Sequence, residues 1–474
     1  KVKGELNTVA AARVSEDDIQ DRARALIADE SQGALLDTGD HDVDRIFETA
    51  ADTVAAEYTT STVLHFQLEP LNALAFRNAQ GVWEIHTGNQ WQSLALPWLQ
   101  KALGVEEGGV VMRSYLLGGG FGRRLNGDYA VPAALASKAL DGVPVKMVMS
   151  RPDDVVFDSP RSPSVQKLRM AFDAGKNVIA MDTAVAAGWP TKVMIPGFMP
   201  NGVNGQPYDP FSSDGADHWY SVGAQRVRAI SNDVAESTFR PGWLRSVSPG
   251  WINWAVESFM HEAAVKAGKD PLQFRLGLLK AEGRNAGSSP NAVGGASRQA
   301  TVLQKVAELS GYGQQKLPPD TAIGLATSYG QSRSMPTWVG GAAQVQVDRT
   351  NGRVSVQKLW LAVDCGTVVD PDGARAQCEG AALWGLSMAL YEGTAFEHGL
   401  VRDRNLDSYT PLRMIDTPEV VVAFVESQEA PVGLGEPGTT VIAPAIGNAI
   451  FEAVGVRLRH LPISPQAILS ALRG

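Results

Sequence analysis

Alternating apolar and polar positions predict three hairpins of β-strands along the chain. The paired segments are 73–76 with 82–86, 168–172 with 178–181, and 345–347 with 354–356. Each pair flanks a short run that contains Gly and Asn, which is typical of a tight turn. A further strand is predicted over residues 110–117, ending at a run of glycines.

Apolar residues at helical spacing predict helices between these strands. One runs from Trp254 to Ala267, where Gly268 suits a C-cap, and another opens at Pro271 after the N-cap residue Asp270. A third covers residues 375–390, with Trp384 on its apolar face. Strands and helices are mixed without regular βαβ alternation, which favours an α+β fold.

Length and composition predict a globular protein with several domains. The chain has 474 residues, of which 44% are hydrophobic and 20% charged. At roughly 100–200 residues per domain this length indicates about two to four domains. A loop-rich stretch at 286–296 predicts a boundary between a first region, 1–290, and a second region, 291–474.

Charge and cysteine content exclude several classes of function. A net charge of −9 without a long basic run argues against a nucleic-acid partner. Two cysteines, Cys365 and Cys378, are too few for an iron–sulfur cluster or a structural zinc site. We expect both to be buried as small apolar residues, with a disulfide between them as the alternative.

No apolar run is long enough to span a membrane, and no signal core follows Lys1. Two interpretations stay open. Either the protein is cytoplasmic, or a targeting segment has been removed or lies on another polypeptide.

The first candidate for chemistry is the glycine run at 118–124, which contains Gly119, Gly120, Phe121 and Gly122. Glycines at the end of a strand let the backbone approach a ligand closely. The run matches neither a dinucleotide fingerprint nor a phosphate-binding P-loop. The adjacent Arg123-Arg124 favours an anionic ligand, and the alternative is a solvated turn.

The second candidate is Glu436, in the loop Gly433-Leu434-Gly435-Glu436-Pro437-Gly438. A carboxylate between glycines, followed by a proline of fixed φ, is a rigid way to present one acidic group to a cavity. An exposed turn with a solvated glutamate is an equally good interpretation of the pattern. A predicted helix start at 443–451, which includes Asn448, follows and would present free N–H groups.

Two further stretches have polar residues in apolar surroundings. Gln377 and Glu379 lie on a helix that otherwise looks buried, so they need partners, from neighbouring loops or from a ligand. Arg245 lies near Trp243, Trp251 and Trp254 in the sequence, which indicates either stacking on an aromatic ring or the binding of an anion.

Taken in order, these stretches resemble the large subunit of the xanthine oxidase/aldehyde oxidoreductase family. The resemblance is strongest to the isoquinoline 1-oxidoreductase beta-subunit and membrane-associated aldehyde dehydrogenase type. The matching segments are 65–72, 118–124, 245–257, 268–275, 363–371, 377–380 and 433–438.

The resemblance implies a multi-domain molybdenum-hydroxylase large-subunit fold with mixed sheets and packed helices. Regions 1–290 and 291–474 would then be two molybdopterin-binding regions. The implied cofactor is molybdenum held by molybdopterin cytosine dinucleotide. Glu436 aligns with the catalytic base of the family. The residues that the resemblance places near the cofactor are Gly119, Gly120, Phe121, Gly122, Arg245, Gln377, Gly435 and Asn448, with Gln90 as a further candidate near the metal.

The resemblance also implies partners and a cellular location. Electrons would leave through iron–sulfur clusters on a small subunit, with a cytochrome c as a candidate acceptor. Relatives have a Met-Gly-Gln-Gly loop that this chain lacks, so we expect that loop on another chain or on a processed amino-terminal half. The membrane-associated relatives favour a periplasmic location.

Two activities fit the resemblance: oxidation of an aldehyde to a carboxylic acid, and hydroxylation of an N-heteroaromatic ring, with water as the oxygen source. Two alternatives stay open. One is a non-catalytic, cofactor-free scaffold of the same fold, although retention of Glu436 between its glycines argues against it. The other is a cofactor-independent enzyme that uses Glu436 as a simple base.

Overall fold

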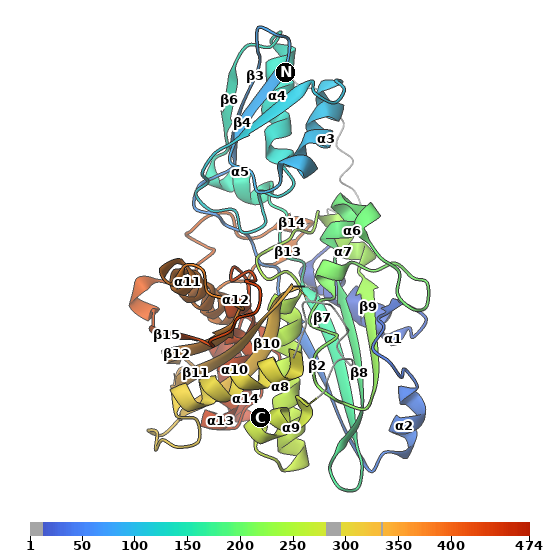
Figure 1. Ribbon diagram of the computed structural model, residues 1–474, viewed down its shortest axis with the longest axis vertical. Coiled ribbons are helices and arrows are strands. Elements are labelled where there is room, and N and C mark those ends of the chain that lie inside the picture. The colour runs from blue at the N-terminus through green and yellow to red at the C-terminus, as the bar shows by residue number, and fades with distance from the viewer. Residues whose placement is uncertain (1–12, 281–294, 333–334) are drawn as a thin grey trace.

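The computed structural model describes residues 13–280, 295–332 and 335–474. Helices and mixed sheets form an α+β fold, so the predicted fold class is confirmed (Figure 1). Two large sheets make up the body of the molecule, and a smaller sheet with its own helices forms a separate lobe at one end.

The first large sheet has six strands. Their order is β1 (Ala34–Leu35), β9 (Ala224–Ser231), β8 (Val178–Ala187), β7 (Ser164–Phe172), β2 (Asp52–Thr60) and β16 (His460–Leu461). Because successive side chains of a strand point to opposite faces, Ala184 and Ala186 pack against α1 (Glu16–Ala28). Val185 and Ala187 point the other way, into the central core.

The second large sheet has four strands. Their order is β10 (Thr321–Ser332), β11 (Met335–Val347), β12 (Val354–Asp364) and β15 (Glu419–Phe424). Two helices, α10 (Gly295–Ser310) and α13 (Ile442–Val454), cover its faces. Consecutive glycines of β11 point to the two faces: Gly340 lies against Val302 of α10, and Gly341 lies against Val441 beside α13.

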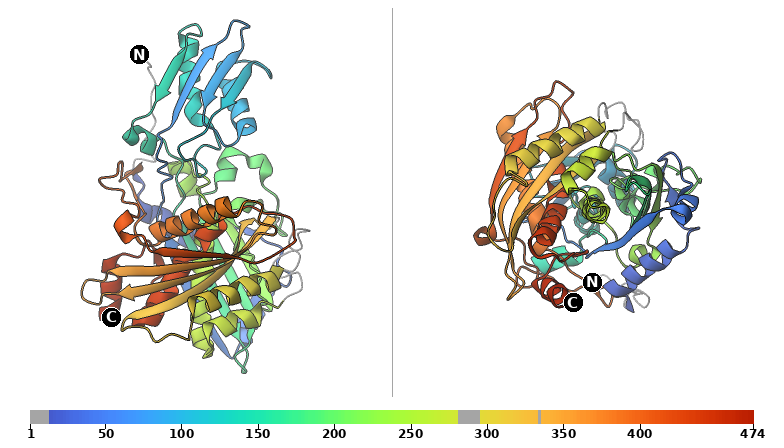
Figure 2. Two further views of the ribbon diagram at one scale, coloured as in Figure 1. Left: turned by 60° about the vertical axis from the view of Figure 1, so that its left-hand side comes forward. Right: turned by 90° about the horizontal axis from the view of Figure 1, so that it is seen from below.

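Helix α8 (Pro249–Ala267) lies between the two large sheets, as the right-hand view of Figure 2 shows. It is therefore buried on nearly every side, and its residues Asn253, Glu257 and His261 have internal hydrogen-bond partners. Glu257 accepts hydrogen bonds from the Arg275 Nε at 2.9 Å and from the Thr327 N–H at 3.0 Å. This buried pair ties α8 to α9 (Pro271–Leu278) and to β10.

The small lobe, residues 72–148, has its own sheet and core (Figure 1). The strand order is β5 (Val110–Ser114), β4 (Trp83–Thr87), β3 (Asn72–Arg77) and β6 (Val145–Val148), and the helices are α3 (Gln92–Leu103) and α4 (Val131–Ala139). Leu99 of α3 and Ile85 of β4 are completely buried in this core. Two chain segments, 61–71 and 149–163, join the lobe to the body.

The structure also contains a long helix, α11, and several shorter elements. They are α2 (Val43–Thr49), α5 (Arg151–Val156), α6 (Pro190–Met194), α7 (Asp233–Thr238), α11 (Pro371–Leu390), α12 (Pro437–Thr440), α14 (Pro465–Arg473), β13 (Phe396–Glu397) and β14 (Leu400–Val401). In the part of the chain that the structure describes, no helix is long and apolar enough to cross a membrane.

All three predicted hairpins are confirmed, and so are the predicted helices. Helices α8 and α11 begin earlier than predicted, since Pro249 and Pro371 occupy their first turns. The strand predicted over 110–117 is too long, because β5 ends at Ser114. The Tyr115 N–H still donates to the Thr87 carbonyl of β4, and farther on the Gly118 N–H donates to the Glu69 carboxylate instead.

The predicted boundary near residue 290 falls within residues 281–294, outside the described residues. One hydrophobic core contains side chains from β7 and α8 together with side chains from β11 and α13. The described parts on either side of residue 290 therefore pack as one body. Cys365 and Cys378 are both buried and free, as predicted.

Candidate functional site

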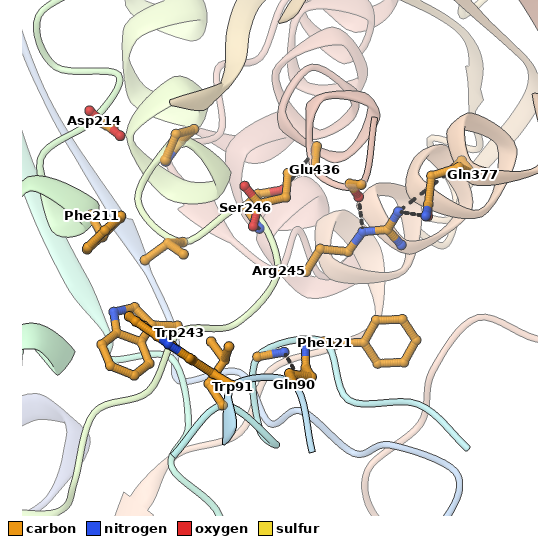
Figure 3. Close-up of a pocket in the computed structure, with 15 residues that line it drawn as sticks. Gln90, Trp91, Phe121, Phe211, Asp214, Trp243, Arg245, Ser246, Gln377 and Glu436 are labelled. Atoms are coloured by element: carbon orange, nitrogen blue, oxygen red, sulfur yellow. Dashed lines mark hydrogen bonds between the residues drawn. The ribbon is translucent and has the colours of Figure 1, made fainter. Parts of the chain in front are cut away.

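A cavity of about 640 Å³ lies where the small lobe meets the body. Its walls come from segments far apart in the sequence. The lining residues are Gln90, Trp91, Phe121, Gly122, Leu125, Phe211, Asp214, Trp243, Arg245, Ser246, Val247, Pro249, Gln377, Gly435 and Glu436. In Figure 3, Glu436 and Ser246 lie on one side of the cavity, and Trp91 and Trp243 lie across from them.

The glycine run forms the small-lobe wall of the cavity. Gly122 has a φ of +108°, and a Cβ built there would lie 1.4 Å from the Trp243 carbonyl oxygen, so only glycine fits. The Phe121 carbonyl accepts from the Arg245 N–H at 2.9 Å, and the Gly122 N–H donates to Gln90 Oε1 at 3.2 Å. Phe121 and Gly122 line the cavity, whereas Gly119 and Gly120 shape the loop behind them.

The anionic ligand inferred from Arg123 and Arg124 is wrong, because both side chains are completely buried and bonded within the protein. Arg123 pairs with Asp128 at 2.8 Å and with Asp158 at 3.2 Å. Arg124 pairs with Glu69 at 2.9 Å and donates to the Gly119 carbonyl at 3.0 Å. These two arginines brace the glycine run from inside.

Arg245 lies on the loop between α7 and α8 and crosses to the opposite wall. Its guanidinium donates to the Gly435 carbonyl and, at 2.8 Å, to Gln377 Oε1 (Figure 3). It stacks on Trp384, 5.8 Å from the ring centroid, rather than on the tryptophans next to it in sequence. Arg245 therefore connects its own segment to those that contain Gln377 and Gly435. All three segments resemble the family, and they meet at one cavity.

Gln377 belongs to the cavity wall, although the reason for singling it out is wrong. The first half of α11 is solvent-facing, with Gln377 exposed and Glu379 half-buried. The apolar face of α11 becomes continuous only beyond Gly380. Gln377 has a described partner, Arg245, and its side chain faces the cavity.

Glu436 presents its carboxylate to the cavity directly before α12. Its Oε1 accepts the Ser246 N–H at 3.2 Å, and its carbonyl accepts the Ser246 hydroxyl at 2.9 Å. Burial raises the pKa of Glu436 above its ordinary value, while the Ser246 N–H, Arg245 and Arg161 oppose that rise. Of the two interpretations of this loop, the presented carboxylate is the one that the structure supports.

Asn448 lies apart from the cavity, on α13. It is completely buried, donates to the Leu325 carbonyl at 2.9 Å and accepts from Arg457 at 2.8 Å. Its side chain therefore ties α13 to β10 in the core. The predicted contact of Asn448 with a cofactor has no support from this geometry.

Several wall residues were not predicted as a set from the sequence. Trp91, Phe211 and Trp243 form an aromatic wall across from Glu436 (Figure 3). They come from the start of α3, a short 3-10 helix and the loop after α7, so no local pattern unites them. Ser246 and Val247 have positive φ values of +72° and +30°, which no residue type there signals.

Comparison with known proteins places the chain in a family. A molybdopterin cofactor-binding domain model matches residues 27–277, and a second molybdopterin cofactor-binding domain model matches residues 260–418. The chain therefore belongs to the molybdopterin cofactor-binding domain family. Its predicted resemblance to the xanthine oxidase family large subunit is confirmed.

Two curated relatives are similar over most of the chain. A membrane-bound aldehyde dehydrogenase of Gluconacetobacter polyoxogenes, whose name includes pyrroloquinoline quinone, is 61% identical, covering 97% of this chain and 59% of the relative. The isoquinoline 1-oxidoreductase subunit beta of Brevundimonas diminuta is 31% identical, covering 86% of this chain and 50% of the relative. The chain thus spans between half and three-fifths of the length of these relatives.

A solved structure has the same fold. The aldehyde oxidoreductase of Desulfovibrio gigas superposes with a TM-score of 0.74 at 17% identity, covering 94% of this chain and 63% of that chain. At this identity the likeness supports the fold, and the site must be argued from its own residues.

The cavity fits the cofactor that the family models imply. Gly435 lines it, and a Cβ built on Gly435 meets no atom within 4 Å, so this wall is open to a ligand. At Gly122 the wall is bare backbone. Gln90, Arg245 and Gln377 supply polar groups in a largely apolar cavity, and its volume of about 640 Å³ lies in the range of cofactor sites.

Proposed function

We propose that this chain forms the base-bearing part of a molybdenum-dependent hydroxylase. The observation that carries the proposal is the Glu436 carboxylate, which is half-buried, held by the Ser246 N–H and faces the cavity. Membership of the molybdopterin cofactor-binding domain family and the similarity to an aldehyde dehydrogenase and an isoquinoline oxidoreductase subunit support it.

When bound, molybdenum on its pterin supplies the two-electron redox chemistry of such a reaction. Phe121, Gly122, Arg245, Gln377 and Gly435 are the residues that would hold it here. For an aldehyde the balance is aldehyde plus water giving carboxylic acid, two protons and two electrons. In this scheme Glu436 accepts a proton from the water-derived oxygen at its second carboxylate oxygen, since Oε1 is engaged by Ser246.

We infer that the substrate is an aldehyde rather than an N-heteroaromatic ring. The supporting observation is the higher identity to the aldehyde dehydrogenase, 61% against 31% for the isoquinoline enzyme subunit. Trp91, Phe211 and Trp243 make the wall facing Glu436 apolar, which suits an uncharged substrate. A comparison of kcat/KM for aliphatic aldehydes, aromatic aldehydes and isoquinoline tests this inference, and a preference for isoquinoline would overturn it.

The cofactor identity is tested by metal and nucleotide analysis of the native complex. We expect molybdenum, with cytosine nucleotide released on hydrolysis, which is the dinucleotide form we propose. The name of one relative makes pyrroloquinoline quinone a specific alternative. An active complex that holds this quinone without molybdenum would overturn the proposal, and so would an active metal-free protein that uses Glu436 alone. An inactive complex without molybdenum would favour the alternative of a non-catalytic, cofactor-free scaffold with the same fold.

The role of Glu436 is tested by Glu436→Gln. We expect kcat to fall about 10²–10⁴-fold, the usual contribution of a positioned base, with molybdenum content unchanged. The matched control is Glu429→Gln, which changes an exposed glutamate a few residues earlier and should leave kcat unaltered. Equal activity of the two variants would remove Glu436 from the mechanism.

We further propose three partners and a periplasmic location. Because the chain spans only part of its relatives, the rest of the site would come from a chain or segment with the Met-Gly-Gln-Gly loop. An iron–sulfur small subunit and a cytochrome c would remove the electrons. Purification of the native complex, with iron analysis and cell fractionation, tests all of these, and an active complex without iron would contradict the electron route.

A further inference from the structure

Arg161 is a buried arginine with an unusual environment. It lies on the segment that joins the small lobe to the body, paired with Val63 through its backbone. It is 6% exposed, and among the described residues it forms no ion pair or hydrogen bond with a carboxylate. Its Nε has no hydrogen-bond partner in the part of the chain that the structure describes. A buried charge without an ion pair costs stability, so a specific reason for keeping it is expected.

The described hydrogen bond of the Arg161 guanidinium leads to the active site. Nη2 donates to the Arg245 carbonyl oxygen at 3.1 Å. That carbonyl belongs to the peptide between Arg245 and Ser246. The N–H of the same peptide donates to Glu436 Oε1 at 3.2 Å. One peptide group thus connects a buried cation to the carboxylate in the cavity.

The connecting peptide lies in a strained conformation. Ser246 has a φ of +72°, in the left-handed region that a serine adopts only at a cost. Rotating this peptide would turn its N–H away from Glu436 and its carbonyl away from Arg161. The Arg161 hydrogen bond therefore opposes the relaxation that would remove a donor from Glu436.

We propose that Arg161 is a positioning residue for Glu436 and acts through the Arg245–Ser246 peptide. Arg161 holds and polarises this peptide, so that the peptide N–H binds the ionised carboxylate. Hydrogen bonds in a chain strengthen one another at low dielectric, so a cation on the carbonyl makes the N–H a better donor. The inference rests on the proposed role of Glu436.

The surrounding charges agree with this role. Glu436 is faced by Arg245 and Arg161, and Arg161 is faced by Tyr409, Glu392 and Glu436. Burial lowers the pKa of Arg161 to about 10, which leaves it charged at neutral pH. Glu392 accepts no described hydrogen bond from Arg161 and instead accepts the Tyr409 hydroxyl at 3.0 Å. Glu436 is therefore the carboxylate to which Arg161 is connected through the Arg245–Ser246 peptide, an arrangement that we call the electrostatic relay.

The test is a double-mutant cycle in unfolding, which needs neither cofactor nor turnover. Arg161→Met, Glu436→Gln and the double variant are unfolded in urea at pH 8 and at pH 4. We expect a coupling of about tenfold in the unfolding equilibrium constant at pH 8 and no coupling at pH 4, because protonation of Glu436 removes the charge that the peptide N–H binds. Coupling of equal size at both pH values, or no coupling at pH 8, would overturn the inference.

Arg228→Met is the matched control. Arg228 is also a buried arginine, and the hydrogen bonds described for it go to the backbone carbonyls of Ile27, Asp29 and Gln32. Its loss should lower stability without coupling to Glu436→Gln at either pH. If Arg161→Met fails to fold, Arg161→Lys, which keeps the charge, and Arg161→Gln, which does not, replace it. At pH 8 the Arg161→Gln substitution should then show coupling to Glu436→Gln, and Arg161→Lys should show less. Equal coupling of the two substitutions to Glu436→Gln would overturn the inference.

In the loaded complex the same variant should change the pH profile. Arg161→Met should raise the acid-limb pKa of kcat/KM by about one unit and lower kcat, with KM little altered. If Glu436→Gln keeps full activity while the coupling persists, the proposed function fails and the electrostatic relay stands. If Glu436→Gln is inactive and the coupling is absent, the relay fails and the proposed function stands.

Discussion

At the scale of single residues, the site depends on two positions: one that only glycine can occupy and one that requires a glutamate. Gly122 is the sharpest case, because its backbone lies against the Trp243 carbonyl at the junction of the lobe and the body. Glu436 is the other, because its carboxylate accepts the Ser246 N–H and its carbonyl accepts the Ser246 hydroxyl. Both depend on the loop 243–247.

Gly122→Ala should lower stability strongly. The new Cβ would lie 1.4 Å from the Trp243 carbonyl oxygen and would need a φ of +108°, so we expect a loss of about 3–5 kcal/mol. The measurement is urea unfolding. Gly197→Ala is the control, since a Cβ there meets nothing within 4 Å and should change stability by less than about 1 kcal/mol. Equal losses of stability in the two variants would show that the backbone around Gly122 can shift to accommodate a Cβ.

At the scale of elements, buried polar groups hold distant segments together. Glu16, the first residue of α1, accepts from the Thr62 N–H and from the Thr62 hydroxyl, each at 2.8 Å, and from the Phe396 N–H at 3.3 Å. It thereby joins α1 to the lobe connection and to β13. Burial raises the pKa of Glu16 to about 7.

This pKa predicts how stability changes with pH. The folded chain binds the Glu16 proton more tightly than the unfolded chain, whose pKa is near 4.5. The stabilisation is therefore complete below about pH 4.5 and is lost as the pH rises to about 7, by up to about 3 kcal/mol. Urea unfolding across this range should show the slope in the wild type and in Glu30→Gln, an exposed control, and lose it in Glu16→Gln. A slope that survives in Glu16→Gln would assign it to another group.

At the scale of the whole molecule, the small lobe and the body have separate hydrophobic cores. The cavity lies at their junction, so its geometry depends on how the lobe is held. Ion pairs cross this junction: Arg123 of the lobe pairs with Asp158 on a connecting segment, and Arg240 of the body pairs with Asp128 of the lobe. The connection is therefore a packed interface with internal charges rather than a free hinge.

Separate cores predict separate local unfolding. Leu99→Ala removes a completely buried side chain from the lobe and should cost about 2–5 kcal/mol there. Hydrogen exchange measured by mass spectrometry should show lost protection within residues 72–148 and little change in the large sheets. Leu361→Ala, in the core of the body, should instead lower protection in the body. Loss of protection throughout the molecule in Leu99→Ala would mean that lobe and body unfold together.

The amino-acid sequence by itself determined the local structure and the identity of the family. Alternation and turn residues identify the hairpins, and capping residues identify α8 and α9, because these signals act between near neighbours. The glycine run, Arg245, Gln377 and Glu436 could all be singled out as unusual residues. Their order along the chain was sufficient to name the family.

Only the tertiary structure decided which of these residues form one site. Arg123 and Arg124 look like ligands for an anion, yet the nearby Asp128 and the distant Asp158 and Glu69 neutralise them. Asn448 looks accessible at a helix start, yet β10 covers it. Ser246 and Arg161 gave no signal, because a peptide that joins a cation to a carboxylate exists only once loops far apart in sequence have packed together.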